Sequence, residues 1–407
     1  MTPLAVLLRQ EAFTDADIIR LLGLTDPGEC ECLRRAAYDL TTWIIGDKVH
    51  YRGIVEFSNR CTLNCRYCGI RRDNLVLERY HLSMAEIVEC AVWAAENGYG
   101  SVCLQAGERR DRPFIDFVTE CICLIRARTV SATLPNGASI TLSLGEQTLD
   151  TYRRWREAAG GADCMRYLLR IETSNPALFA HLHPGGFAHE KGYAGRIQAL
   201  ENLREAGFQV GTGGMIGLPG QTLADLCADL RFYQRIDADM LGMGPYILSQ
   251  GADMCAEGMM EPAPLLQRAL NMLAVSRLVL RDVNIPPRPL CRPWPRMAAN
   301  AASPMAATSS CRTSPPARSA KPTSSTTTSP ASTINRPIAA PAWRAVSAAW
   351  ADRSAGTSGA ARAISVGAWS LRCRTDHRCR PRPCRPSPFM SASPFGAVRL
   401  APIPRPL

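Results

Sequence analysis

The first 286 residues alternate between short apolar runs and longer amphipathic stretches. The apolar runs are often β-branched and end in glycine or polar residues, which is typical of strands, while the stretches between them have helical spacing. This βα repetition predicts a parallel sheet covered by helices, and six or more units favour a (β/α) barrel over an open sheet. The expected strands are 51–57, 100–105, 139–144, 165–171, 208–216 and 238–247, and the expected helices are 83–97, 114–128, 147–159, 194–206, 222–235 and 261–280.

Residues 1–50 predict a helical segment in front of this barrel. Thr14 is a suitable helix cap, because acidic residues follow it in the first turn. Pro27, preceded by Asp26, starts a second helix that runs towards Gly46. We therefore expect a helical segment over 1–50 and the barrel over 51–286.

The chain changes character near Pro286. From residue 287 to the end, 18 basic residues face two acidic ones, which gives this segment a net charge of +16 and no glutamate. The first 286 residues hold 29 basic and 34 acidic residues, so the overall charge of +11 comes from the tail alone. The tail also holds 19 of the 30 prolines. By composition it is disordered, and a basic tail of this kind is also typical of nucleic-acid binding.

The 17 cysteines are the next unusual feature. No export signal is visible, and no window of about 20 apolar residues predicts a membrane span. A cytoplasmic location is therefore the expectation. In that compartment metal or cluster chemistry is favoured over a disulfide framework.

Three of these cysteines, Cys61, Cys65 and Cys68, stand in a short polar loop after the first expected strand. Three thiolates can hold three irons of a 4Fe-4S cluster and leave the fourth iron open. A structural zinc site would need a fourth ligand, and His81 is thirteen residues beyond Cys68. Chance spacing is the remaining alternative. The spacing, the preceding strand and Tyr67 together favour the cluster.

Polar residues follow the strands at the ends where a barrel builds its active site. Gly107 and Glu108 form a tight turn after Gln105, and such a turn can receive the ammonium group of a bound amino acid through its carboxylate and backbone carbonyls. Thr141 and Ser143 share one face of the third strand, which would point into the barrel. A purely structural strand would place valine or isoleucine there.

Charged residues continue this pattern in the fourth strand. Arg170 and Glu172 share one face, and buried charges are costly unless they pair with each other or with a ligand. The alternatives are therefore a mutual salt bridge or contacts with a bound cation and anion. Arg196, at the start of a helix, is either a site residue or a solvated helix charge. The glycines of 213–220 permit close approach of a ligand, but they lack the Gly-Lys-Ser/Thr ending of a P-loop.

The cysteine spacing, with an aromatic residue before the last cysteine, is similar to the loop signature of the radical S-adenosylmethionine (SAM) enzymes. Over about residues 5–286 the chain resembles one family closely, HydE, the radical SAM maturases of FeFe-hydrogenase. Biotin synthase and methylornithine synthase look like more distant relatives. The strings that carry the resemblance are Glu56 to Cys61, Tyr67 to Asn74, Thr141 to Glu146, Tyr167 to Thr173, Gly217 to Thr222 and Asn284 to Pro286.

The resemblance implies a (β/α)8 TIM barrel with a 4Fe-4S cluster and SAM at its top. It implies that the cluster is bound by Cys61, Cys65 and Cys68. The positions expected to bind SAM are Gln105, Gly107, Glu108, Ser143, Glu172 and Arg196. The positions expected near the substrate are Gln105, Thr141 and Arg170.

The implied activity is reductive cleavage of SAM to methionine and a 5′-deoxyadenosyl radical. The radical would act on an iron–carbonyl–cyanide cysteine precursor, an organometallic substrate on the route to the hydrogenase di-iron centre. The implied partners are a flavodoxin or ferredoxin electron donor and other hydrogenase maturases, with no nucleic acid and no membrane. Arg71 and Arg72 either dock an acidic donor or pair locally. Another small-molecule radical SAM synthase is the alternative enzyme.

The tail departs from this family, which continues with a seventh strand, an eighth strand and a closing helix. We hypothesise a reading-frame shift near Pro286, because shifted codons of 304–314 can encode a string that resembles the eighth strand. Shifted codons of 323–343 can likewise encode a string that resembles the family's C-terminal region. A shift that is present in the gene predicts an incomplete barrel with about six to seven intact strands, a disordered tail over 287–407 and an inactive product. Sequencing the DNA across codons 280–292 tests it.

Overall fold

The computed structural model describes residues 2–46, 48, 50–160, 165–184, 192–286 and 309–313. All of these belong to one compact unit, Met1–Lys321. The frame shift and the disorder expected for most of 287–407 lie outside the described residues and stay predictions. Across the described ranges, no helix has the length and apolar character needed to cross a membrane.

The six expected strands are all present, and they pair in parallel within one sheet. Its order is β7-β5-β4-β3-β2-β1-β9. The fourth strand is shorter than expected, since regular pairing stops at Leu168 and resumes only as a bridge between Glu172 and Gly214. The strands are β1 (His50–Ser58), β2 (Ser101–Ala106), β3 (Ser139–Ser143), β4 (Arg166–Leu168), β5 (Gln209–Thr212), β7 (Met240–Leu241) and β9 (Ser309–Thr313), and a second small sheet pairs β6 (Met215–Ile216) with β8 (Gly244–Pro245).

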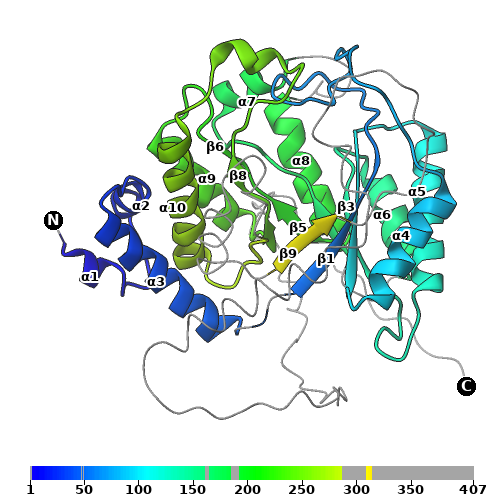
Figure 1. Ribbon diagram of the computed structural model, residues 1–407, viewed down its shortest axis with the longest axis horizontal. Coiled ribbons are helices and arrows are strands. Elements are labelled where there is room, and N and C mark those ends of the chain that lie inside the picture. Colours follow the sequence, from blue (N-terminus) through cyan, green and yellow to red (C-terminus); the bar gives the residue numbers. More distant parts are fainter. Residues whose placement is uncertain are drawn as a thin grey trace, which may run out of the picture. The chain divides into compact units, whose positions relative to one another are not determined.

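One strand falls in the segment for which none was expected. β9 pairs in parallel with β1 from His50 to Ile54, and the two lie side by side in Figure 1. That is the place of an eighth strand in a closed barrel. On the other edge, Met240 of β7 bridges to Asn284, where a seventh strand would begin. Within the described residues the sheet does not close between these two edges.

The expected helices are also present, with bounds within a few residues of the prediction. Thr14 caps its helix in a capping box with Asp17, and Asp26 caps the next helix ahead of Pro27. The helices are α1 (Leu4–Leu7), α2 (Asp15–Leu22), α3 (Pro27–Ile44), α4 (Met84–Glu96), α5 (Arg112–Arg128), α6 (Leu149–Ala158), α7 (Pro176–Leu182), α8 (Gly192–Glu205), α9 (Leu223–Arg235), the 3-10 turn η1 (Asp253–Glu257) and α10 (Pro262–Leu280).

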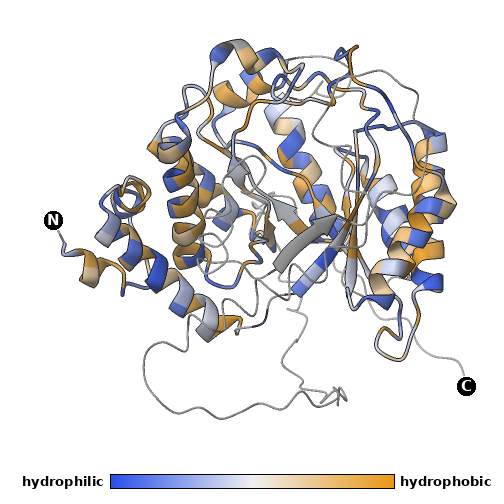
Figure 2. Cartoon of the chain, in the orientation of Figure 1, coloured by the Kyte–Doolittle hydropathy of each residue, from blue (hydrophilic) through white to orange (hydrophobic). Residues whose placement is uncertain are grey.

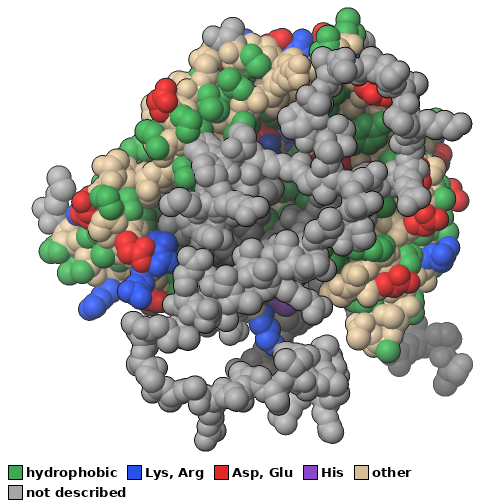
Figure 3. All heavy atoms as spheres, in the orientation of Figure 1, with side chains coloured by type: hydrophobic (Ala, Val, Ile, Leu, Met, Phe, Trp, Pro, Cys, Tyr) green, Lys and Arg blue, Asp and Glu red, His purple; other side chains and the backbone are tan. Residues whose placement is uncertain are grey.

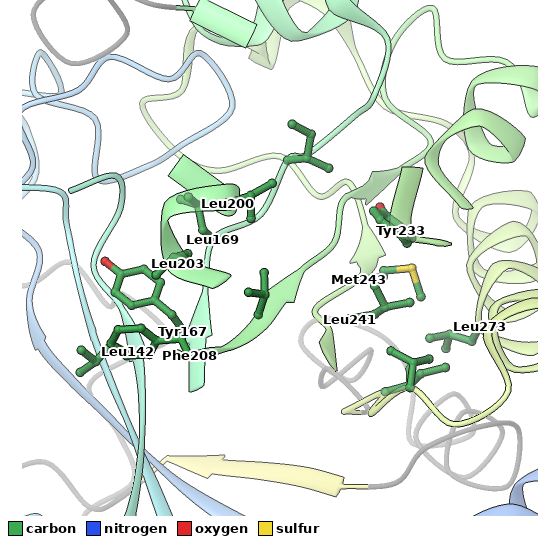
Figure 4. Close-up of a cluster of buried hydrophobic side chains, with 14 of the residues drawn as sticks. Leu142, Tyr167, Leu169, Leu200, Leu203, Phe208, Tyr233, Leu241, Met243 and Leu273 are labelled. Carbon is green, nitrogen blue, oxygen red and sulfur yellow. The ribbon is translucent and has the colours of Figure 1, made fainter. Parts of the chain in front are cut away.

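The main core contains side chains from both the sheet and the helices. On β3, Ile140 and Leu142 belong to it, whereas Thr141 does not. Figure 4 shows Leu142 beside Tyr167 and Phe208 in this layer. α10 contributes a long run of buried residues and is mostly apolar in Figure 2. The side-chain amide of its Asn271 donates to the carbonyls of Leu22 and Leu24 and so fastens the N-terminal helices to it.

Candidate active site

The inner face of the sheet carries the polar residues that were expected there. Gln105 and Ser143 are paired in register on β2 and β3, so their side chains leave the sheet at the same level. Thr141 is only 1% exposed, and its hydroxyl has no hydrogen-bond partner among the described residues. An unpartnered buried hydroxyl costs about 1–3 kcal/mol, so this face is not optimised for stability alone.

The two charges of the fourth strand pair with each other. Arg170 Nη2 lies 2.7 Å from Glu172 Oε1, which confirms the mutual salt bridge. The hydroxyl of Tyr67, in the cysteine loop, donates to the same oxygen at 3.3 Å. Yet Arg170 Nη1 and Glu172 Oε2 are both buried without a partner in the described part of the chain. Each charge therefore keeps one polar atom for a ligand, and the two alternatives are compatible.

Glu172 also has an unusual backbone. Its φ of 66° places a non-glycine residue in the left-handed region, which is disfavoured for a side chain of this size. Glu172 lies four residues beyond the end of β4 and returns to the sheet only through its bridge to Gly214. The side chain of Glu172 is 3% exposed and lies beside the cysteine loop, where it accepts from the Tyr67 hydroxyl.

Arg196 is not a solvated helix charge, since it is 5% exposed. Its Nε donates to Glu146 Oε1 at 2.5 Å, and its Nη1 donates to the carbonyl of Arg170. Burial acts to lower the pKa of Arg196, but Glu146, Tyr67 and Glu108 together raise it above its usual range. Glu146 was not among the predicted site residues. Its place directly after β3 and Gly145 is the sequence signal that could have identified it.

The turn after β2 supports the cysteine loop. The Glu108 carboxylate accepts from the backbone N–H of Glu146 at 2.8 Å and pairs with Arg110 at 2.9 Å. Its backbone carbonyl accepts from both the N–H and the hydroxyl of Thr62, each at 3.0 Å. Burial raises the pKa of Glu108. These contacts give Glu108 a supporting position, with its carbonyl already engaged by the loop.

The close approach of the cysteine loop to the turn after β2 also requires a glycine at position 107. A Cβ at this position would lie 2.4 Å from the carbonyl oxygen of Arg60 and 2.7 Å from the Cβ of Cys61. Real Cβ atoms are not found that close to backbone, so any larger residue would push the cysteine loop away. Two glycines farther along also lie close to neighbouring backbone, and the close ligand approach expected for 213–220 stays a prediction. A Cβ on Gly213 would meet the carbonyl of Gly242 at 2.4 Å, and one on Gly214 would meet that of Glu172 at 2.5 Å.

The three cysteines of the loop lie in one small cluster. Cys65 is buried, Cys61 and Cys68 are half-buried, and all three pack with Leu63 and Tyr67. The backbone N–H of Cys68 donates to the carbonyl of Cys65 at 3.1 Å. Burial raises the pKa of all three thiols, that of Cys68 to about 11. The thiols therefore hold their protons until a metal displaces them.

A single-ion site and a cluster place different demands on the three thiols. Among the described residues, no three His, Cys, Asp or Glu side chains converge on one metal position. A zinc ion would need its sulfur ligands within about 2.3 Å of one point. A 4Fe-4S cluster binds each thiolate through a different iron, so its ligands stand farther apart.

The arginines after the last cysteine pair locally. Arg71 pairs with Asp253 of η1, and Arg72 pairs with its neighbour Asp73 at 2.8 Å. Local pairing, the second alternative for these residues, is confirmed. These pairs and the contacts of Asn74 with the carbonyls of Gly69 and Gln250 fold the segment against the loop around η1.

The chain matches the family model described as the Radical SAM superfamily over residues 55–233. The [FeFe] hydrogenase maturase subunit HydE of Thermotoga maritima is 39% identical over 280 residues, which cover 69% of this chain and 74% of that protein. Biotin synthase of Magnetococcus marinus is 26% identical over 267 residues, covering 64% and 76%. The crystal structure of methylornithine synthase has a TM-score of 0.64 at 22% identity, covers 77% of this chain and 87% of that one, and shares the fold.

Proposed function

Because the chain belongs to the HydE family of radical SAM enzymes, we propose that it acts in the maturation of FeFe-hydrogenase. One observation carries the proposal. The three-cysteine loop lies against the end of a barrel-type sheet whose inner face holds buried polar atoms without partners in the described residues. Such a face costs stability unless a ligand occupies it. A protein with only a structural role would be more stable with apolar residues on this face.

The proposed cluster ligands are Cys61, Cys65 and Cys68. When bound, a 4Fe-4S cluster supplies the electron that cleaves SAM to methionine and a 5′-deoxyadenosyl radical. The chain's own part is to place three thiols in one buried loop and to exclude water around them. Gly107 and the Glu108 carbonyl support this role, because they hold the loop against the turn after β2.

The proposed SAM residues are Gln105, Gly107, Glu108, Ser143, Glu172 and Arg196. Glu172 is best suited to direct contact, since its second carboxylate oxygen is buried and has no partner in the described chain. Arg196 and Glu108 are engaged with Glu146 through its carboxylate and its backbone N–H respectively. Their contribution is to hold the turns after β2 and β3 in place. Gln105 and Ser143 lie at one level between these turns.

The proposed substrate residues are Gln105, Thr141 and Arg170. The hydroxyl of Thr141 and the Nη1 of Arg170 provide buried donors, which suit the anionic groups of an iron–carbonyl–cyanide cysteine precursor. We propose a flavodoxin or ferredoxin as the electron donor and the other hydrogenase maturases as functional partners. The chain is proposed to act in the cytoplasm.

A different small-molecule radical SAM synthase is the second enzyme candidate, because the fold is shared with methylornithine synthase. The two differ in product. The maturase is expected to restore hydrogenase activation when it is added to the remaining maturases, whereas a synthase of another small molecule would not.

A nucleic-acid-binding protein is the candidate from another class, and it rests on the tail charge. In Figure 3, both acidic and basic side chains of the described residues are visible around the rim of the face shown. Steeply salt-dependent DNA binding that is lost on deletion of 287–407 would favour this candidate. A frame-shifted, inactive product is the last candidate, and soluble protein that cleaves SAM would contradict it.

The direct test is anaerobic reconstitution with iron and sulfide, followed by electron paramagnetic resonance (EPR) spectroscopy and a 5′-deoxyadenosine assay. The wild-type chain is expected to show a 4Fe-4S signal that SAM perturbs. The Cys65→Ala variant is expected to show neither the signal nor the product.

A further inference from the structure

Arg79 occupies an unusual position between the cysteine loop and α4. It lies in an irregular segment, and its guanidinium donates to five backbone carbonyls. Among the described residues it forms no ion pair with a carboxylate. Nη1 donates to the carbonyls of Asn59 at 2.6 Å and Ile70 at 2.9 Å, and Nη2 donates to those of Arg71 at 2.5 Å, Arg72 at 3.2 Å and Asn74 at 3.2 Å.

These acceptors stand on both sides of the cysteine loop. Asn59 is two residues before Cys61, and the segment 70–74 begins two residues after Cys68. One side chain therefore joins the two ends of the loop. The backbone N–H of Arg72 also donates to the carbonyl of Leu63 at 2.7 Å, so the clamped segment contacts the middle of the loop as well.

The chain around Arg79 is fixed in turn. The side-chain amide of Asn59 donates to the carbonyl of Glu78 at 2.7 Å, and its oxygen accepts from the N–H of Tyr80 at 2.8 Å. The hydroxyl of Ser58 donates to the carbonyl of Tyr80 at 3.1 Å. Arg79 is thus held against the end of β1, from which the cysteine loop departs.

An arginine suits this place better than a lysine. The loop has little regular structure, so its carbonyls need donors from elsewhere. A guanidinium offers five N–H groups in one rigid plane, whereas a lysine ammonium offers three on a flexible stem. The positive charge also lies close to the loop, because Nη1 donates to the carbonyl of Asn59, two residues before Cys61.

We propose that Arg79 is a positioning residue for the cluster, which clamps the two ends of the cysteine loop and favours the reduced state through its charge. The second part follows because reduction adds a negative charge beside three thiolates, and a nearby cation stabilises it. The inference rests on the proposed role of the loop as the cluster site. It adds a residue outside the cysteine motif to that site.

The clamp is tested first in the protein without iron, by hydrogen exchange. The variants are Arg79→Met, Arg79→Lys and the control Arg112→Met, whose side chain is 75% exposed and pairs with Asp116 on α5. We expect amides of 61–74 to exchange about tenfold faster in Arg79→Met, the change that corresponds to losing about one favourable hydrogen bond. Arg79→Lys is expected between Arg79→Met and the wild type, and the control unchanged. Wild-type exchange in Arg79→Met would overturn the clamp.

The charge effect is tested after reconstitution, by a redox titration followed by EPR. In Arg79→Met the ratio of reduced to oxidised cluster at a fixed potential is expected to fall about tenfold, or about 59 mV for a one-electron couple. Arg79→Lys keeps the charge and is expected to keep most of the potential despite its looser loop. An unchanged potential and spectrum in Arg79→Met would overturn this part.

The outcomes also separate this inference from the proposed function. A wild-type chain without any cluster signal contradicts the function, while hydrogen exchange still decides the clamp. A wild-type signal with no difference in Arg79→Met contradicts the inference alone. Thermal unfolding shows whether each variant is folded. If Arg79→Met does not fold, hydrogen exchange of Arg79→Lys becomes the deciding measurement. Exchange of its 61–74 amides at the wild-type rate would then contradict the clamp.

Discussion

The two faces of the same strands carry different kinds of side chain. On β3, Leu142 packs into the core beside Tyr167, while its neighbour Thr141 points to the other side with a buried hydroxyl that no described residue satisfies. On the segment after β4, Ile171 belongs to the core, whereas Arg170 and Glu172 pair across the inner face. The outer face is optimised for packing, and the inner face keeps polar groups whose burial costs stability.

This difference separates the residues that stabilise the fold from the residues that are available to bind a ligand. Burying an ion pair is at best a weak source of stability, because desolvation offsets the attraction. The outer core gains about 25 cal/mol for each Å² of apolar surface removed from water. We therefore expect changes on the outer face to alter the free energy of unfolding, and changes on the inner face to alter ligand binding.

The largest effect is expected on the outer face. Trp155→Ala, at a residue that is 0% exposed on α6, should lower the free energy of unfolding by about 3–5 kcal/mol because a large cavity replaces the ring. Denaturant unfolding measures it. Trp43→Ala, at a residue that is 76% exposed, is the control and should change little. Equal losses in the two variants would contradict the outer layer as the source of stability.

Asp229 on α9 is an exception to this division, because it is an ionisable group in the otherwise apolar outer layer. It is 1% exposed and accepts from the N–H of Ser174 at 2.5 Å, and burial raises its pKa to about 7. In the unfolded chain its pKa is about 3.9, so between these values the native state binds more protons. Its contribution to stability is complete below about pH 4 and is lost as the pH rises to about 7.

The size of this effect is up to about 4 kcal/mol, at about 1.4 kcal/mol for each pKa unit. Unfolding measured across that pH range in wild type and in Asp229→Asn checks it. The difference between the two proteins should change with pH. A constant difference would show that Asp229 titrates normally.

Gly107 lies where the two faces meet the cysteine loop. Gly107→Ala places a Cβ 2.4 Å from the carbonyl oxygen of Arg60, which should cost about 1–3 kcal/mol and displace the loop. We expect iron content after reconstitution to fall more than stability does. Gly100→Ala is the matched control, because nothing lies within 4 Å of its Cβ. Normal iron content in Gly107→Ala would remove the proposed support.

The smallest effect, and the one of opposite sign, is expected at Thr141. Thr141→Val keeps the shape and removes the unsatisfied hydroxyl, so the free energy of unfolding should rise by about 1 kcal/mol. Conversion of the substrate should fall while uncoupled formation of 5′-deoxyadenosine persists. A loss of stability instead would mean that the hydroxyl has a structural partner.

Most of the fold could be predicted from local sequence patterns. The strands and helices followed from apolar periodicity, and the caps at Thr14 and Asp26 followed from the residue types themselves. α7 was missed although Asn175 and Pro176 are a helix-start signal, because the helix has only seven residues. The strand Ser309–Thr313 was missed because its segment has the composition of a disordered tail.

The site was only partly predictable. Alternation placed Thr141, Arg170 and Glu172 on the inner face, and the spacing of the cysteines predicted their loop. The partner of Arg196 could not be predicted, since it depends on how the turn after β3 meets α8. Arg79 gave no signal at all, because its five acceptors are backbone carbonyls that only the path of the folded chain brings together.

The measurement that tests the central claim most directly is EPR of the anaerobically reconstituted, reduced chain, recorded with and without SAM for the wild type and Cys65→Ala. We predict a 4Fe-4S signal in the wild type that changes when SAM is added and that is absent from Cys65→Ala. An equal signal in both proteins, or no signal in a wild-type chain shown to be folded, would contradict the assignment of the three-cysteine loop as the cluster site.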